Sequence, residues 1–143
     1  MSRTPPSTRD MFPLFRTVPT RWNDNDLYGH MNNAIHYLLF DTAVNGWLME
    51  AGLLEFGAEH AFIVAETGCR YHGDIMFPDV VNVGLRISKL GGSSVVWQIG
   101  LFRGDAEVAS ADGMFVHVHV KREGHKPTPM SDEVRAVLEP LVT

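Results

Sequence analysis

The sequence is poor in features that mark several large classes of protein. It has one cysteine, Cys69, among 143 residues, so it can form neither an intrachain disulfide nor a thiolate metal cluster, and a reducing compartment is expected. No apolar run approaches the roughly 18 residues that a membrane-spanning helix needs. The first dozen residues also lack the order of a secretory signal, a charged stub followed by an apolar core. We therefore expect a cytoplasmic protein that makes no contact with a membrane.

Positive charge is scarce as well. Twelve Lys and Arg residues stand against seventeen Asp and Glu, a formal net charge of -5, which opposes binding to nucleic acid or to an anionic lipid surface. A local basic patch at Arg70, or at Lys121 and Arg122, could still hold a phosphate. We expect no nucleic-acid partner.

Several catalytic motifs are missing from the chain. It contains no Gly-x-Ser-x-Gly, no phosphate loop ending in Gly-Lys-Ser/Thr, no His-Glu-x-x-His and no dinucleotide-binding glycine fingerprint. His117 and His119 share one face of a predicted strand, a spacing that two metal ligands can use, and His125 follows. No carboxylate or cysteine completes a ligand set in that run. We therefore predict no metal and interpret the histidine face as solvated or as an interface.

The remaining composition is that of an ordinary globular domain, with 45% hydrophobic and 20% charged residues. Residues 1–11 are rich in Pro, Ser and Thr and bury little apolar surface, so we expect a loose tail there. Residues 12–143 are long enough for one domain with a real core.

Helical periodicity follows Asn33. Apolar side chains recur at i, i+3, i+4 and i+7 spacing, namely at Ile35, Leu38, Leu39, Thr42 and Trp47. Small Ala43 and Gly46 lie between them and would let a sheet come close. Asn32 or Asn33 can cap the start of this helix, and Gly52 is a plausible end.

Period-two alternation dominates the second half of the chain. We expect strands over 12–22, 61–71, 81–87, 95–101 and 114–120, with a hairpin turn at 91–94 and a terminal helix over 131–138 capped by Ser131. In the last strand Met114, Val116, Val118 and Val120 alternate with the two histidines. The order of elements predicts an α+β fold in which an antiparallel sheet wraps one central helix.

A resemblance to a known family is carried by the segment Asp24-x-Asp26-x-x-Gly29-His30-Met31-Asn32-Asn33, with Tyr37 after it. It resembles the front end of hotdog-fold acyl-CoA thioesterases of the 4-hydroxybenzoyl-CoA thioesterase type. Cys69-Arg70-Tyr71, Asp79-Val80-Val81 and the run from His125 to Pro129 resemble later parts of the family, so the similarity covers roughly residues 14–138. It implies a hotdog fold and hydrolysis of an acyl-CoA to a free acid and CoA.

The resemblance also implies roles for residues near the helix start. Asp26 matches the catalytic carboxylate, and backbone NH groups around Asn32 and Asn33 would polarise the thioester carbonyl, consistent with the partial positive charge of a helix N-terminus. Asp26 could attack the carbonyl or take a proton from water, and the sequence leaves both routes open. Gly29 would supply an unusual backbone conformation, and His30 would support the loop or touch substrate.

Substrate contacts and assembly are implied in the same way. Tyr28, Met31, Asn32, Arg70 and Tyr71 are the candidate substrate-binding residues, and Ile63 is a further candidate for the acyl pocket. Family members pair edge to edge, so we expect a homodimer with active sites at the interface, or a homotetramer stacked through the His117 and His119 face. No cofactor is expected, because coenzyme A is part of the substrate. The acyl group is left open.

Two other functions compete with hydrolysis. From the residues alone, the Asn-Asp-Asn-Asp run over 23–26 could form turns and caps without catalysis, which would suit a module that only binds acyl-CoA. Hotdog enoyl-CoA hydratases use an acid five residues before a histidine, but Asn25 stands five before His30. The sequence also has Pro78 where the thioesterase family commonly has a glycine before the acid matched by Asp79.

Overall fold

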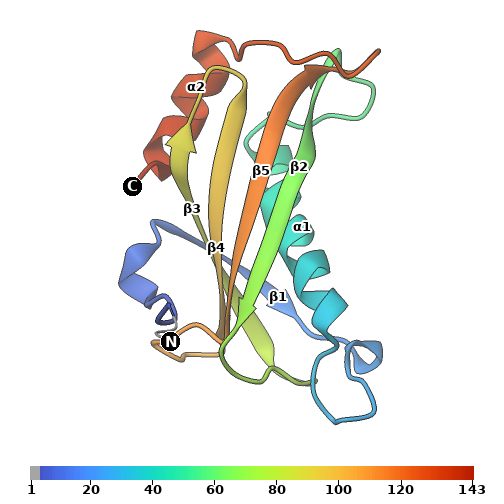
Figure 1. Cartoon of the computed structure of the whole chain (residues 1–143), viewed down its shortest axis with the longest axis vertical. Helices are drawn as coiled ribbons and strands as arrows, with labels where there is room; N and C mark the ends of the chain where they lie inside the picture. The colour runs from blue at the N-terminus through green and yellow to red at the C-terminus, as the bar shows by residue number, and fades with distance from the viewer. Residues whose placement is uncertain (1–3) are drawn as a thin grey trace.

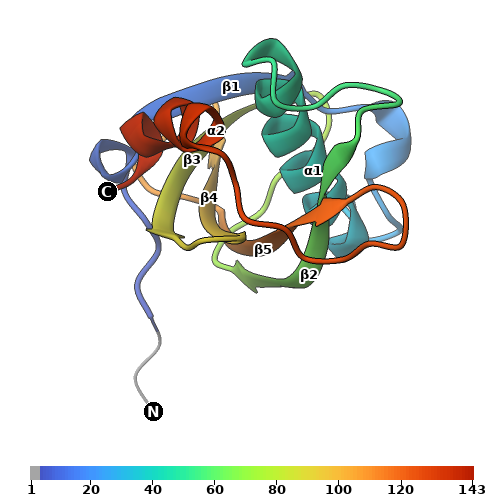
Figure 2. The same ribbon diagram turned by 90° about the horizontal axis from the view of Figure 1, so that it is seen from above.

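The computed structural model, which describes residues 4–143, is a five-stranded antiparallel sheet curved around one long helix, as Figures 1 and 2 show. The strands are β1 (Leu14–Pro19), β2 (His60–Tyr71), β3 (Val80–Leu90), β4 (Ser94–Arg103) and β5 (Ala111–Lys121), in the sheet order β1-β3-β4-β5-β2. The helices are α1 (Asn33–Glu50) and α2 (Asp132–Leu138), with single 3-10 turns at Arg9–Met11, Trp22–Asp24 and Glu139–Leu141. The predicted α+β class and its sheet-around-helix arrangement are confirmed.

Both ends of α1 form where the sequence predicts. The Asn32 side chain accepts a hydrogen bond from the Ala34 NH at 2.9 Å, which satisfies one of the donors left free at a helix start. The helix ends at Glu50, and Gly52 follows with a φ of +78°, a conformation that favours glycine.

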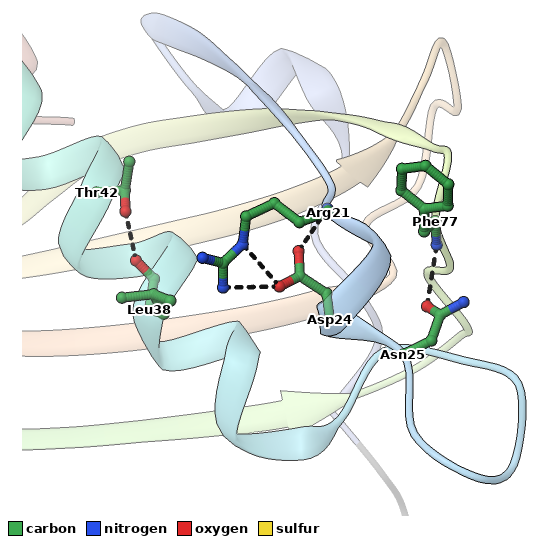
Figure 3. A network of polar contacts seen from close by, with 6 residues as sticks. All are labelled: Arg21, Asp24, Asn25, Leu38, Thr42 and Phe77. Atoms are coloured by element: carbon green, nitrogen blue, oxygen red, sulfur yellow. Dashed lines mark hydrogen bonds and ion pairs between the residues drawn. The ribbon is translucent and has the colours of Figure 1, made fainter.

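The buried face of α1 differs from the predicted one. The helix buries His36, Leu39, Phe40, Ala43, Val44 and Leu48. Leu38 is 45% exposed, and the Thr42 hydroxyl, also at the surface, donates to the Leu38 carbonyl (Figure 3). Apolar residues occur all around this helix, so periodicity permitted more than one buried stripe. Packing on the sheet selected the stripe that contains Phe40 and Ala43.

The close approach of helix and sheet depends on a glycine of the sheet. A Cβ on Gly113 of β5 would overlap the Phe40 ring, so the ring occupies the space that a side chain would take. Gly46 on the helix, which was predicted to admit the sheet, instead faces the Arg16 guanidinium. The contact between Phe40 and Gly113 sets how near α1 lies to the sheet.

β5 presents its histidines to the helix, so the predicted solvated or interface role of that face is wrong. His117 is 1% exposed, and His119 is buried with its Nδ1 2.8 Å from the Thr128 carbonyl oxygen. Side chains alternate along a strand, so residues on the same face as Gly113 and Phe115 must turn inward. The predicted tetramer contact through the histidines is excluded for the same reason, since α1 covers that face.

The two edges of the sheet differ. β1 pairs with β3 from Val80 to Leu85, and Val142 continues beside Ile87 as a parallel bridge. Within residues 4–143, β2 has a partner on one side only. Its other edge offers unpaired backbone groups over 12 residues, the kind of edge on which a further strand can add.

The predicted first strand over 12–22 is shorter in the structure. It begins at Leu14 and ends at Pro19, because Phe12 leaves the sheet edge to pack across Gly84 and Gly100 on the face away from α1. The other four predicted strands, the 91–94 hairpin turn and the terminal helix are confirmed.

The N-terminal segment is docked from Ser7 onward, so the predicted loose tail over residues 1–11 is wrong in its boundary. The Ala109 NH donates to the Ser7 carbonyl at 2.9 Å, and the Arg9 guanidinium lies 5.0 Å from the centre of the Phe102 ring while donating to the Gly104 carbonyl. The first three residues of that predicted tail lie outside the described residues. Within residues 4–143, no helix has both the length and the apolar character to cross a bilayer.

Gly113→Ala tests the contact between helix and sheet. The added methyl group would push against the Phe40 ring, and we expect the free energy of unfolding to fall by about 1–3 kcal/mol in urea denaturation. Gly68→Ala is the matched control, because nothing lies within 4 Å of a Cβ there. Equal stability of the two variants would contradict this account. Phe40→Leu added to Gly113→Ala should recover part of the loss.

His117 should make stability depend on pH. Burial lowers the pKa of His117 to about 4, whereas an unfolded histidine takes up its proton near pH 6.5. The unfolding free energy is therefore unaffected by protonation of His117 above about pH 6.5. It decreases as the pH falls toward 4, by roughly 3 kcal/mol in all. His117→Leu should remove that part of the slope of unfolding free energy against pH. His125→Asn, at an exposed position, should keep it, and identical slopes in wild type and His117→Leu would refute the assignment.

Candidate functional site

The segment from Thr20 to Asn32 joins β1 to α1 at one end of the sheet and is tied to the chain just before β3. The Met31 NH donates to the Ile75 carbonyl at 2.7 Å, and the Thr20 NH donates to the Asp79 carbonyl at 3.1 Å. The Asn25 side chain accepts from the Phe77 NH at 3.0 Å (Figure 3). These bonds fix the loop against a second loop that is about 50 residues further along the chain.

The turn around Pro78, where the sequence departs from the pattern of the thioesterases that it resembles, is closed by Asp79. Its carboxylate accepts from the Met76 NH at 3.0 Å and pairs with the Arg103 guanidinium at 2.7 Å. The Phe77–Pro78 peptide bond is cis. The contacts of Asp79 therefore stabilise this turn, and the Phe77 NH remains placed to bind the Asn25 side chain.

Asp24, the first acid of the motif, holds the loop together. It is 2% exposed, and its carboxylate accepts from the Arg21 backbone NH at 2.7 Å and from the Arg21 guanidinium at 2.9 and 3.1 Å (Figure 3). Its carbonyl accepts from the Asn32 NH at 2.9 Å. With every one of these groups occupied, Asp24 has the loop-ordering role that the sequence suggested.

Asp26, the second acid, lies at the surface of a tight turn. Its NH donates to the His30 carbonyl at 3.0 Å, its carbonyl accepts from the Gly29 NH at 3.1 Å, and its Oδ1 accepts from the Tyr28 NH at 2.8 Å. Gly29 has a φ of +83°, which confirms its predicted backbone role. Within the described chain, no side chain or NH group binds Oδ2 of Asp26, so that oxygen is available for chemistry.

A cleft opens beside this carboxylate. It has a volume of about 390 Å³ and is lined by Trp22, Asn23, Asn25, Asp26 and Gly29. The Trp22 ring is mostly exposed and meets the Phe77 ring edge-on at 5.8 Å between centroids. Trp22 and Asn25 were not among the predicted site residues. Asn25 could have been noticed for its place between the two acids, whereas nothing in the sequence singled out Trp22.

The start of α1 offers fewer free NH groups than predicted. The Asn32 NH is already bound to the Asp24 carbonyl, and the Ala34 and Ile35 NH groups are bound to Asn32 itself. The Asn33 NH, at the first helical position, has no intrahelical acceptor, and no other acceptor for it occurs in residues 4–143. The expectation that the Asn32 NH could polarise a carbonyl is therefore wrong, and Asn33 is the remaining donor of that pair.

Tyr71 of β2 reaches the same point from the sheet. Its hydroxyl donates to the Asn33 carbonyl at 3.0 Å, and its ring meets the His36 ring edge-on at 4.7 Å. Burial raises the pKa of Tyr71, so the hydroxyl stays protonated and remains a donor. Burial also lowers the pKa of His36, a residue that sequence reasoning did not include in the site. A neutral imidazole and a neutral phenol thus support the first turn of the helix.

The other predicted substrate residues are dispersed. Tyr28 is 84% exposed and stacks on His30, with 6.3 Å between the ring centroids. Met31 is 2% exposed and belongs to the core cluster of the single chain, away from the surface that carries Tyr28. Arg70 of β2 lies opposite Asp112 of β5 in the sheet register and therefore faces away from α1, on the opposite side of the sheet from Tyr71.

The acyl pocket predicted from Tyr28, Met31, Ile63 and Tyr71 does not form within one chain. Ile63 pairs with Val118 on the face turned away from α1, whereas Tyr71 faces the helix.

Residues 4–143 also bring no three His, Cys, Asp or Glu side chains into a group that could hold a metal ion.

Comparisons with known proteins agree with this geometry. The sequence pattern of the thioesterase-like superfamily matches residues 20–138. The structure of the PA5185 protein from Pseudomonas aeruginosa PAO1 is similar, with 40% identity and a TM-score of 0.93 over 97% of this chain and 98% of that one. A thioesterase from Thermus thermophilus, solved with coenzyme A and zinc, has 30% identity and a TM-score of 0.76 over 91% and 95%. Protein YsmA of Bacillus subtilis is 24% identical over 127 residues, 89% of this chain and 86% of its own length.

The two acids should respond differently to the same substitution. Asp24→Asn removes the charge that pairs with Arg21 in a buried position, and we expect the unfolding free energy to fall by about 2 kcal/mol. Asp26→Asn keeps an Oδ1 acceptor for the Tyr28 NH at a more exposed position and should leave stability within about 0.5 kcal/mol of wild type. Urea denaturation of both variants measures the difference. A larger loss in Asp26→Asn would reverse the assigned roles.

Proposed function

Because this chain belongs to the thioesterase-like superfamily, we propose that it is an acyl-CoA thioesterase that hydrolyses its substrate to a free acid and coenzyme A. The observation that carries the proposal is the Asp26 carboxylate, held by the Tyr28 NH at one oxygen and open to the cleft at the other. A pocket for a neutral thioester has no evident need of such a group. A hydrolase does, because a nucleophile or a base has to act on the carbonyl carbon or on water.

The second element of the proposal is the NH of Asn33. A thioester carbonyl gains negative charge when it is attacked, and a free backbone donor at a helix N-terminus stabilises that charge. The Tyr71 hydroxyl, by binding the Asn33 carbonyl at 3.0 Å, holds this residue in place. In this scheme the catalytic residues are Asp26 and Asn33. Gly29 and His30 shape the turn that presents the carboxylate.

Two routes use the same carboxylate. In one, Asp26 attacks the carbonyl, coenzyme A leaves as its thiolate, and water hydrolyses the mixed anhydride. In the other, Asp26 takes a proton from a water molecule that attacks directly. Trapping of an acylated Asp26 with hydroxylamine would identify the first route.

Coenzyme A is proposed as the thiol because the Thermus thermophilus thioesterase, 30% identical, was solved with coenzyme A. The substrate itself contains the coenzyme, so the scheme assigns no cofactor. Exposed Trp22, which lines the cleft, and exposed Tyr28 of the same loop would contact the apolar part of the acyl group. We propose that the reaction takes place in the cytoplasm, because a chain with a single cysteine forms no intrachain disulfide and suits a reducing compartment.

The proposed active unit is a homodimer. The open edge of β2 can pair with the same strand of a second copy, and this would bring the partner's surface next to Tyr71 and the start of α1. Such pairing would complete an acyl pocket that one chain leaves open. A tetramer would need a surface other than the buried histidine face.

The second candidate function is acyl-CoA binding without turnover. It is favoured by the turn itself, because the bond from the Tyr28 NH to Asp26 Oδ1 gives the carboxylate a structural task. The enoyl-CoA hydratase alternative is weaker, since Asn25 uses its side chain to hold the Phe77 NH.

Asp26→Asn tests the proposal directly. We expect kcat/KM for acyl-CoA hydrolysis to fall by about 10²–10⁴-fold, because the amide is neither a nucleophile nor a base. The assay follows free thiol released from a panel of aliphatic and aromatic acyl-CoAs. Asp105→Asn, at an exposed position in the turn between β4 and β5, is the matched control and should keep wild-type activity.

Each outcome assigns the site differently. Unchanged turnover in Asp26→Asn would overturn the catalytic role of the carboxylate. Binding of CoA esters by wild type without release of thiol from any of them would favour the binding module. Intact folding and oligomer size in the variant must accompany any loss of activity.

A further inference from the structure

The face of the sheet that turns away from α1 carries a polar cavity that the proposed hydrolysis does not use. Cross-strand pairing aligns Arg86, Gln98, Met114 and Gly68 in one row across β3, β4, β5 and β2. In the next row Arg70 lies opposite Asp112. Two adjoining cavities of about 270 Å³ each share Arg70, Gln98 and Asp112 in their walls.

A glycine leaves the hollow open. Nothing lies within 4 Å of the position that a Cβ on Gly68 would occupy. On the same face, the space above Gly84 and Gly100 is filled by the Phe12 ring. The chain therefore closes one part of this face with its own aromatic side chain and leaves the part beside Arg70 and Gln98 empty.

The N-terminal segment forms one wall of the cavity. Residues 4–7 line it together with Met11, and the Ser7 NH donates to Asp112 Oδ2 at 3.0 Å. The same oxygen lies 3.1 Å from His72 Nε2. These contacts fix the wall, so the cavity is a built feature of the fold.

The charges of the cavity are not balanced by the protein. Oδ2 of Asp112 is engaged by Ser7 and His72, and its Oδ1 is buried without a hydrogen-bond partner in residues 4–143. Neither Arg70 nor Arg86 has a carboxylate partner within the same residues. The Nε of Arg86 is buried without any hydrogen-bond partner in that part of the chain. An unsatisfied buried donor carries a free-energy cost. Two guanidinium groups thus border the cavity beside the N-terminal segment, in a chain whose net charge is -5.

We propose that this cavity binds a small organic acid, with its carboxylate on the Arg86 guanidinium and its apolar part over Gly68 beside Met114. The planar guanidinium fork matches the two oxygens of a carboxylate. The Gln98 side chain, whose amide makes only a 3.4 Å contact to Ser88, adds a second donor. Met11 and Met114 supply apolar walls, which suit an organic body better than a bare inorganic anion.

An NMR titration with benzoate, and with benzamide as its uncharged analogue, tests the site. In the full-length protein, benzoate should shift the backbone amides of Gly68, Gln98 and Met114 saturably, and benzamide should not. Arg86→Gln should weaken benzoate binding roughly tenfold or more. Gly68→Val, which fills the hollow on an edge strand that accepts β-branched residues, should abolish it.

Two control variants show whether binding is confined to this cavity. Arg122→Gln removes an exposed arginine away from the cavity and should leave benzoate binding unchanged. Asp26→Asn should also leave it unchanged, so the result is independent of the proposed hydrolysis.

Several results would overturn the proposal. Shifts centred on residues 26–33 that disappear in Asp26→Asn would place the acid in the candidate active site. Equal binding of benzamide would show that the carboxylate is not recognised. Unaltered affinity in Arg86→Gln, or the absence of any saturable shift, would mean that the cavity has no such ligand.

Discussion

The distance between α1 and the sheet is the constraint on which the rest of the structure depends. It is set where the Phe40 ring occupies the space above Gly113. With the helix held there, its first turn lies beside the end of β2, close enough for the Tyr71 hydroxyl to reach the Asn33 carbonyl. The loop before the helix must then close over a short span. Its hydrogen bonds to Ile75, Phe77 and Asp79 show how that closure is secured.

Within this loop, two acids separated by one residue have different environments, so one can act as a structural anchor and the other can take part in chemistry. Asp24 is buried and bound by Arg21 and Asn32, which makes it a structural centre. Asp26 is held by a single NH at one oxygen and faces a cleft. The proposed chemistry rests on that asymmetry: a rigid support is needed to present a carboxylate whose second oxygen is not consumed by the protein. On the other face of the sheet, Oδ2 of Asp112 is engaged, whereas its Oδ1 and the Nε of Arg86 are buried without a hydrogen-bond partner in residues 4–143.

The sequence predicted the helix start, the helix end and the conformation of Gly29 correctly because each is governed by neighbours within a few residues. Asn32 caps Ala34, and a positive φ at Gly29 and Gly52 needs no distant contact. Where two local patterns were equally good, prediction failed. Both faces of β5 are compatible with burial, so alternation alone could not tell that His117 would turn toward the helix, and the spread of apolar residues around α1 hid which stripe was buried.

What the sequence determined by itself is therefore the α+β class, four of the five strands within a few residues, the capped central helix and the motif that contains Asp26. The tertiary structure decided which face of each element is buried, that Met31 belongs to the core, and that Arg70 and Tyr71 lie on opposite sides of the sheet. It also decided that the Asn32 NH is used by Asp24. The physical reason is that caps and turns are satisfied within a few residues. Burial, cross-strand register and the sharing of hydrogen-bond donors depend on how distant segments of the chain pack together, and only the folded structure sets those positions.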